Sequence, residues 1–198
     1  MKLKLSGCLA AFMICVSAAF SQSPGFEHQK GKWDLSVWTG AETGEETTNS
    51  FAQAQIWLAG VAVGRNLIDL GGRGWRSGSF EYGFDFVPLF ETYGNQRTHG
   101  VGIDPVILRW NSALHTTHLA PYIELSGGAV ITPVNLPPGR TSSFNFTAKG
   151  GGGIYLLSRS HQAFDVGLHW SHISNANLGA DNTEFNGILL TLAYHWYR

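Results

Sequence analysis

The sequence predicts an all-β fold, an eight-stranded antiparallel transmembrane β-barrel, from three observations. Apolar and polar residues alternate in eight segments, each long enough to cross a bilayer as a tilted strand. The chain has 25 glycines among 198 residues and 13% aromatic residues, a composition typical of barrels with aromatic girdles. Beyond the N-terminal segment there is no apolar run of about 18 residues that could form a spanning helix, and no helical periodicity stands out.

Residues 1–21 have the features of a secretory signal peptide. Lys2 and Lys4 precede an apolar run that extends to Phe20. This run is too short and too close to the start of the chain to be retained as a spanning helix. The expected mature protein is therefore a single barrel domain, residues 22–198.

The composition of the expected mature domain excludes several classes of function. Both cysteines, Cys8 and Cys15, lie in the signal segment, so neither a disulfide nor thiol chemistry is expected in the barrel. The chain has 13 Lys and Arg, and without Lys2 and Lys4 the remaining 11 stand against 14 acidic residues. With no basic tract, nucleic acid is not an expected partner. The histidines have no metal-ligand spacing with acids or cysteines, so no metal and no cofactor are expected.

The predicted strands follow one another through polar or glycine-rich turns. The third is the clearest, because the aromatic residues at alternate positions from Phe80 to Phe86 are separated by polar or small residues. A polar lead, 22–31, precedes the first strand, and a proline-rich loop, 133–142, separates the fifth from the sixth. The expected strands are approximately 32–44, 51–66, 75–91, 99–111, 118–132, 143–157, 163–175 and 184–197.

Charged and amide side chains alternate with the apolar rows and are expected to face the barrel interior. Eight strands enclose a space that side chains just fill, and buried charges need partners, so these groups are expected to form a structural network. The glycines 150–153 lack the Gly-Lys-Ser/Thr signature of a phosphate-binding loop, and they indicate a bend or a close approach instead. The expected inward residues are Asp34, Gln53, Gln55, Glu81, Asp85, Glu124, Lys149 and Asp165.

Side chains suited to acyl transfer occur where the last two strands meet their connecting loop. His172 and Ser174 precede this loop and Glu184 follows it. A histidine that activates a serine, with an acid that orients the histidine, is the residue set of nucleophilic acyl transfer. Alternate residues of a strand share a face, so His172 and Ser174 extend the apolar row that contains Trp170. A catalytic group on a lipid-facing row favours a lipid substrate.

The run His172-Ile173-Ser174-Asn175-Ala176, the asparagine eight residues after the serine (Asn182) and the closing aromatic strand resemble the lipid A 3-O-deacylase (PagL) family. The resemblance implies a barrel in the bacterial outer membrane. It implies a serine esterase that removes an ester-linked acyl chain, at the 3-O position, from lipid A of lipopolysaccharide. Ser174 and His172 would be catalytic, at the outer-leaflet rim. Asn175 and Asn182 would help to hold the oxyanion, and ordinary turn chemistry is the alternative for both.

The chain departs from the family pattern at the third catalytic position. The family has an acid twelve residues after the serine, where this chain has Asn186, and Glu184 lies two residues earlier on the same face. In a symmetric hairpin His172 faces Asn186, and Glu184 is the diagonal neighbour within reach. We expect Glu184 to orient His172, because a carboxylate also stabilises the imidazolium. Asn186 is the alternative, as a neutral partner of the kind found in Cys-His-Asn sites.

Two other classes of protein share parts of this pattern. A non-catalytic eight-stranded outer-membrane barrel, with a structural or adhesion role, would have the same strands without a working Ser174. A soluble lipocalin-like barrel would need polar outward rows, and the aromatic row from Phe80 to Phe86 argues against it.

Overall fold

The computed structural model describes residues 30–44, 54–71, 77–94, 97–113, 119–159 and 161–198. The predicted signal peptide, with both cysteines, lies outside the described residues, as does Gln53.

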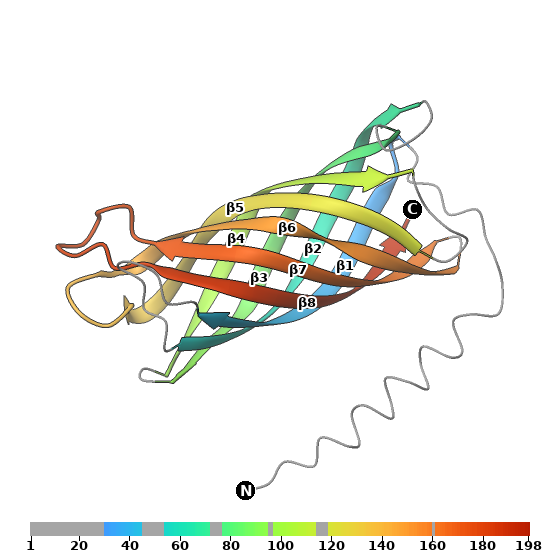
Figure 1. Cartoon of the computed structure of the whole chain (residues 1–198). Helices are drawn as coiled ribbons and strands as arrows, with labels where there is room; N and C mark the ends of the chain where they lie inside the picture. The colour runs from blue at the N-terminus through green and yellow to red at the C-terminus, as the bar shows by residue number, and fades with distance from the viewer. Residues whose placement is uncertain (1–29, 45–53, 72–76, 95–96, 114–118, 160) are drawn as a thin grey trace, which may run out of the picture.

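The described residues form one closed barrel of eight antiparallel strands in which β1 pairs with both β2 and β8 (Figure 1). The predicted fold class is therefore confirmed. The start of β1 and the last residue of the chain meet at one end of the barrel, where Trp33 and Arg198 exchange two backbone hydrogen bonds of 2.7 and 2.9 Å. The strands are β1 (Trp33–Gly44), β2 (Ala54–Leu70), β3 (Gly78–Gly94), β4 (Thr98–Ser112), β5 (Leu119–Leu136), β6 (Ser142–Arg159), β7 (Gln162–Ser174) and β8 (Phe185–Tyr197).

The largest departures from the predicted strand ends are at β2 and β5. Both strands continue four residues beyond their predicted ends, to Leu70 and Leu136. The loop predicted over 133–142 is shorter, because β5 resumes pairing with β6 at Leu136 and Ser142 after an irregularity that follows Ile131. Prolines suggested a loop here, but an irregular stretch of ladder accommodates residues that cannot donate a backbone hydrogen bond.

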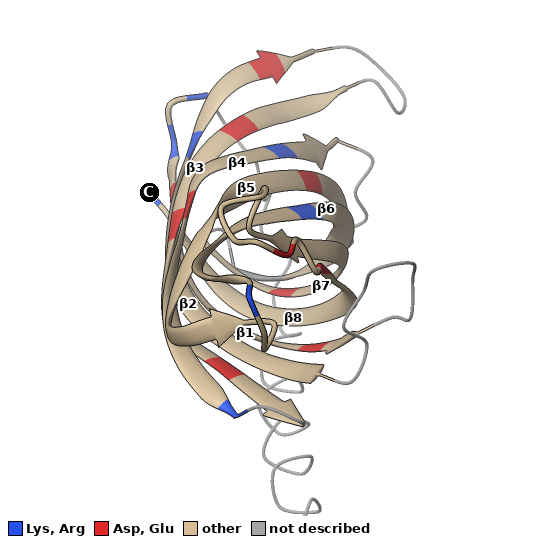
Figure 2. Ribbon diagram, turned by 90° about the vertical axis from the view of Figure 1, so that its left-hand side faces the viewer, with Lys and Arg blue, Asp and Glu red and all other residues tan. Residues whose placement is uncertain are grey.

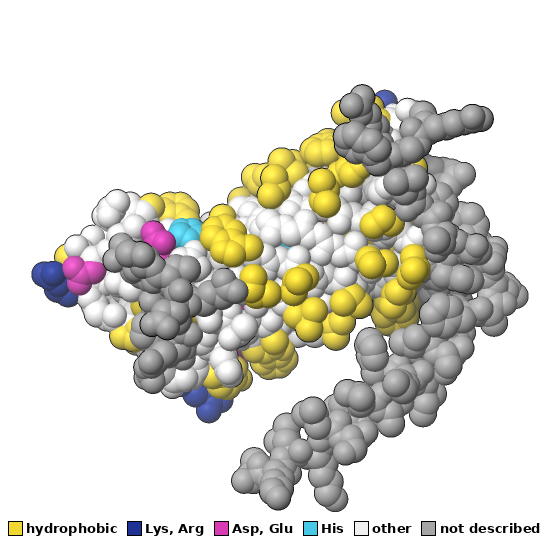
Figure 3. Space-filling view, in the orientation of Figure 1, with side chains coloured by type: hydrophobic (Ala, Val, Ile, Leu, Met, Phe, Trp, Pro, Cys, Tyr) yellow, Lys and Arg dark blue, Asp and Glu magenta, His cyan; other side chains and the backbone are white. Residues whose placement is uncertain are grey.

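The outer wall of the barrel is apolar, as predicted. Tyr82, Phe84 and Phe86 are 43%, 40% and 41% exposed, because alternate residues of β3 point away from the lumen. Hydrophobic side chains lie along the middle of the wall, and on the face shown in Figure 3 the charged side chains lie towards the ends of the barrel. None of the described residues belongs to a helix long and apolar enough to span a membrane.

Charged residues occur on several strands (Figure 2), and many of their side chains line the lumen. Arg109 donates to Glu124 (Nε–Oε2, 2.7 Å) and to the hydroxyl of Tyr155 (2.9 Å), and Lys149 pairs with Asp104. The predicted inward positions of Asp34, Glu81, Asp85, Glu124, Lys149 and Asp165 are confirmed, since all six lie in this network or line the lumen.

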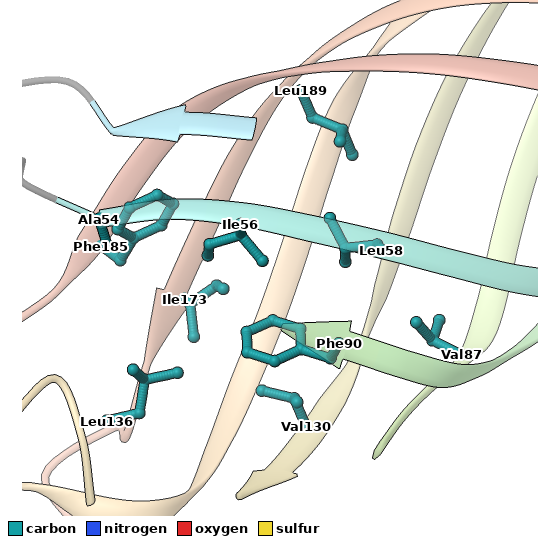
Figure 4. Packing of buried hydrophobic residues seen from close by; sticks show 10 residues of the cluster. All are labelled: Ala54, Ile56, Leu58, Val87, Phe90, Val130, Leu136, Ile173, Phe185 and Leu189. Carbon is teal, nitrogen blue, oxygen red and sulfur yellow. The ribbon is translucent and has the colours of Figure 1, made fainter. Parts of the chain in front are cut away.

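An apolar cluster, here called the plug, packs inside the barrel at the end opposite Trp33 and Arg198 (Figure 4). This plug explains an error in the prediction for β2: Gln55 was expected inside, but it is exposed on the outer face, and Ile56 points into the lumen. The alternation of apolar and polar residues in β2 correctly separated its two faces. The apolar face points into the lumen at this end, however, so the predicted inner and outer faces are exchanged. The plug residues are Ala54, Ile56, Leu58, Val87, Phe90, Val130, Leu136, Ile173, Phe185 and Leu189.

Candidate active site

The β7–β8 hairpin places the candidate catalytic side chains on the outer wall. In this ladder His172 pairs with Asn186, as the symmetric hairpin predicted, and Ile173 pairs with Phe185. Ile173 and Phe185 are 2% exposed in the plug, so their neighbours along each strand point outward. His172 and Asn186 therefore face the same side as Trp170, which is 47% exposed.

Three side chains form a continuous hydrogen-bonded chain on this face. The Nε2 atom of His172 lies 2.9 Å from Oγ of Ser174, and its Nδ1 atom lies 2.8 Å from Oδ1 of Asn186. The carbonyl oxygen of Asn186 can only accept, so the ring proton belongs on Nδ1 and Nε2 is left to accept the Ser174 proton. This is the tautomer that a general base requires. Ser174 and Asn186 are only 9% and 6% exposed.

The indole of Trp170 packs against a face of the His172 ring. The two rings are stacked, with centroids 5.7 Å apart and an interplanar angle of 17°. Because they lie two residues apart on one strand, this contact follows from the alternation of side chains. Stacking on Trp170 and the hydrogen bond to Asn186 together limit rotation of the His172 ring, so that Nε2 stays directed at Ser174.

Glu184 lies at the start of the returning strand and is partly exposed. Within the described residues, its carboxylate forms no hydrogen bond or ion pair, and the side-chain hydrogen bonds of His172 go to Asn186 and Ser174 instead. The expectation that Glu184 orients the histidine therefore has no geometric support here, whereas the alternative residue, Asn186, occupies that position. Asn186 is the directly opposite partner in the ladder, and a Glu in the diagonal place has farther to reach.

Asn175 organises the loop that follows Ser174. Its side chain is fully buried, and its Nδ2 donates to the backbone oxygen of Asp181 at 2.9 Å. The backbone carbonyl oxygen of Asn175 accepts a hydrogen bond from Leu178 N at 3.0 Å. This bond closes a turn whose middle residues, Ala176 and Asn177, have φ of 50° and 64°. The side chain that was expected at the oxyanion thus spans the loop instead, consistent with the turn-forming alternative.

Asn182 lies on the same loop and is only partly exposed. Its Oδ1 accepts a long hydrogen bond of 3.5 Å from Asn177 N. Its side-chain nitrogen Nδ2 makes no hydrogen bond with another described residue, so this group can donate to a substrate oxygen.

A neighbouring loop braces the site loop, and sequence reasoning did not find this contact. Arg140, between β5 and β6, donates to Asp181 from Nε and Nη2 at 3.3 and 3.0 Å, and its backbone oxygen accepts from Asp181 N at 3.1 Å. Gly179 packs so closely on Thr141 and Arg140 that a Cβ there would lie 2.7 Å from Thr141 backbone atoms. The opposite charges of Arg140 and Asp181 were the available signal, but their sequence separation of 41 concealed it.

Small residues of β6 lie beside the candidate catalytic row. Ala148 pairs with His172, and Gly150 pairs with Trp170, on the outward face. Ala148 is exposed and Gly150 is partly exposed. These small residues leave space on the outer surface on this side of His172, where an extended apolar chain can approach the nucleophile.

Comparison with solved structures identifies the class of the barrel. The crystal structure of the outer membrane enzyme PagL aligns with a TM-score of 0.58 and 18% identity, covering 81% of this chain and 97% of that one. Neisserial surface protein A gives 0.55 and 12%, covering 84% and 97%. The outer membrane protein OprG from Pseudomonas aeruginosa gives 0.52 and 10%, covering 87% and 98%. At these identities the likeness concerns the fold alone, and it defines the chain as a small eight-stranded β-barrel.

The family is shown by the sequence itself. The model of the lipid A 3-O-deacylase (PagL) family matches residues 55–195, and the chain belongs to this family. A comparison with curated protein sequences finds no match. The predicted family and outer-membrane location are therefore confirmed, and the family is one of lipid A deacylases.

Proposed function

We propose that this protein is a serine esterase that removes an ester-linked acyl chain from lipid A, at the 3-O position that the family description names. The observation that carries the proposal is the hydrogen-bonded chain Ser174–His172–Asn186 on the lipid-facing wall. A soluble substrate would reach this face only through the bilayer, whereas a lipid lies against it. The family assignment supplies the class of substrate.

The position of the site in the membrane supports the same substrate. Outer-membrane barrels have their chain ends on the periplasmic side and their longer loops outside. The start of β1 and the C-terminal residue meet at the opposite end of the barrel from residues 175–184. His172 and Ser174 then lie at the level of the outer leaflet, which contains lipopolysaccharide.

The acylation step follows from the hydrogen bonds. His172 Nε2 removes the proton from Ser174 Oγ as this oxygen attacks the ester carbonyl. The tetrahedral intermediate collapses, the bond to the sugar oxygen breaks, and His172 returns the proton to that oxygen. An acyl-Ser174 ester and a lipid A with one chain fewer result. Asn186 keeps the proton on Nδ1 throughout and stabilises the imidazolium by accepting its hydrogen bond.

Deacylation repeats the sequence with water. His172 removes a proton from a water molecule, which attacks the acyl-Ser174 carbonyl, and then returns it to Ser174 Oγ as the fatty acid departs. The amide nitrogen of Asn182 is the side-chain donor best available for the oxyanion in both steps, whereas Asn175 holds the loop. No metal and no cofactor enter this scheme.

The test uses purified protein in detergent micelles with hexa-acylated lipid A. The wild type should release one fatty acid per lipid, and Ser174→Ala should release none while it retains the β-type circular dichroism and heat-dependent gel mobility of a folded barrel. A folded wild type that releases no fatty acid would instead favour the non-catalytic structural or adhesion barrel.

A further inference from the structure

An open apolar groove lies on the outer wall, two strands away from the candidate nucleophile. Its volume is about 480 Å³, within the range of roughly 300–1,000 Å³ that ligand pockets occupy. It runs across β4, β5 and the first residues of β6, with His99 at its border. The outward side chains that line it are Val101, Ile103, Ala129, Ile131, Pro133 and Phe144.

The strand register places this groove in line with Ser174. Ser174 pairs with Phe146 of β6, Phe146 pairs with Ala129 of β5, and Ala129 pairs with Ile103 of β4. Phe146 and Ile103, at 44% and 42% exposure, stand above the small Ala129 between them. Neighbouring strands lie about 4.8 Å apart, so Ala129 is roughly 10 Å from the nucleophile along this row.

The adjacent row of outward positions has small residues between the candidate site and the groove. His172 pairs with Ala148, Ala148 pairs with Gly127, and Gly127 pairs with Val106. Of the two positions next to His172 along this row, Ala148 thus carries only a methyl group and Gly127 has no side chain. Phe146, packed edge-on against Phe144 at 5.2 Å, forms a ridge beside this path. The small residues Ala148 and Gly127 thus lead from His172 past Phe146 to Ala129, which lines the groove.

We propose that this groove binds a second acyl chain of the same lipid molecule whose ester Ser174 cleaves. The inference rests on the proposed function. The groove faces the bilayer and offers apolar walls, so its occupant is a hydrocarbon chain. Lipid A has several chains side by side on one headgroup, so a chain next to the reacting one can lie over Ala129, roughly 10 Å from the nucleophile. A chain fixed there would use remote binding to hold the ester carbonyl against Ser174.

Filling the groove should misplace a multi-chain substrate without disturbing the catalytic side chains. Ala129→Trp puts an indole into the groove, and Val101→Trp fills it independently from β4. Because small errors in substrate placement cost up to about a hundredfold in rate, kcat/KM for hexa-acylated lipid A should fall about tenfold to a hundredfold in both variants. Ala41→Trp is the matched control, since Ala41 is an exposed outward alanine on β1, two strands from β7 on the other side.

A second readout isolates the nucleophile from the groove. A fluorophosphonate with one short alkyl chain reacts with Ser174 Oγ and loses fluoride, and it needs no second chain. The proposal predicts wild-type labelling rates in Ala129→Trp and Val101→Trp together with impaired lipid A hydrolysis, and wild-type values of both in Ala41→Trp. Wild-type lipid A hydrolysis in the two groove variants would overturn it, as would a parallel loss of labelling. A wild type that is neither labelled nor active would refute the proposed function itself.

Discussion

Asn186 Oδ1 lies 2.8 Å from Nδ1 of His172, directly across the β7–β8 ladder. A neutral amide thus occupies the place in which a serine triad has its carboxylate. Replacing the triad acid by Asn costs about 10⁴ in kcat when it imposes the wrong histidine tautomer. In the arrangement seen here the carbonyl oxygen faces the ring, so the required tautomer is preserved.

The first prediction therefore concerns the third catalytic position. Asn186→Ala should lower kcat on lipid A by about 10²–10⁴, because His172 loses the acceptor that fixes its tautomer. Asn186→Asp should retain activity, since a carboxylate of the same length accepts the same proton. Both are measured as fatty acid release by the purified barrel.

Glu184→Ala is the control for this position. It should change kcat by less than about threefold, because the Glu184 carboxylate forms no hydrogen bond or ion pair with a described residue. A severe loss in Glu184→Ala with a silent Asn186→Ala would return the orienting role to the carboxylate and would require the hairpin to rearrange when substrate binds.

The second prediction concerns the ring stacked on His172. Trp170→Ala should lower kcat up to about tenfold, since an aromatic contact of this kind contributes roughly 0.5–1.5 kcal/mol. Trp170→Phe should recover most of the rate. Trp196→Ala is a matched control, because Trp196 lies on the outer face far from the site and is 38% exposed. Equal rates in Trp170→Ala and the wild type would show that stacking does not position His172.

The third prediction concerns the brace between the two loops. Arg140 and Asp181 have side chains 77% and 44% exposed, so breaking their pair should change the free energy of unfolding by no more than about 1 kcal/mol. Arg140→Asp should nevertheless lower kcat/KM several-fold, because Asp181 also holds Asn175. The reciprocal double variant Arg140→Asp/Asp181→Arg should recover part of the rate. Failure of the double variant to exceed the single one would exclude a role for this charge pair.

The fourth prediction separates barrel stability from catalysis. Arg109→Met should destabilise the barrel by about 3–5 kcal/mol, because it leaves the buried Glu124 and Glu81 carboxylates without their cation. The exposed Arg65→Met should have little effect. Urea unfolding of the protein in lipid vesicles measures both. A change below about 1 kcal/mol in Arg109→Met would show that the interior charges do not depend on this guanidinium.

The strands and the pairing of His172 with Asn186 could be predicted because they depend on local alternation and on hairpin symmetry. The direction of the β2 faces could not, since alternation separates faces but does not say that a plug makes the lumen around Ile56 apolar. The choice between Asn186 and Glu184 depends on side-chain reach across the ladder. The Arg140 brace joins two loops that become adjacent only when β6 pairs with β7.

We propose that Ser174 cleaves an acyl ester of lipid A in the outer membrane. The decisive measurement is mass spectrometry of lipid A from cells that produce the wild type, Ser174→Ala or no protein. We expect a species lighter by one hydroxyacyl or acyl chain only in wild-type cells, with equal amounts of folded barrel in the Ser174→Ala membranes. Unchanged lipid A in wild-type cells, or the same shortened species in Ser174→Ala cells, would contradict it.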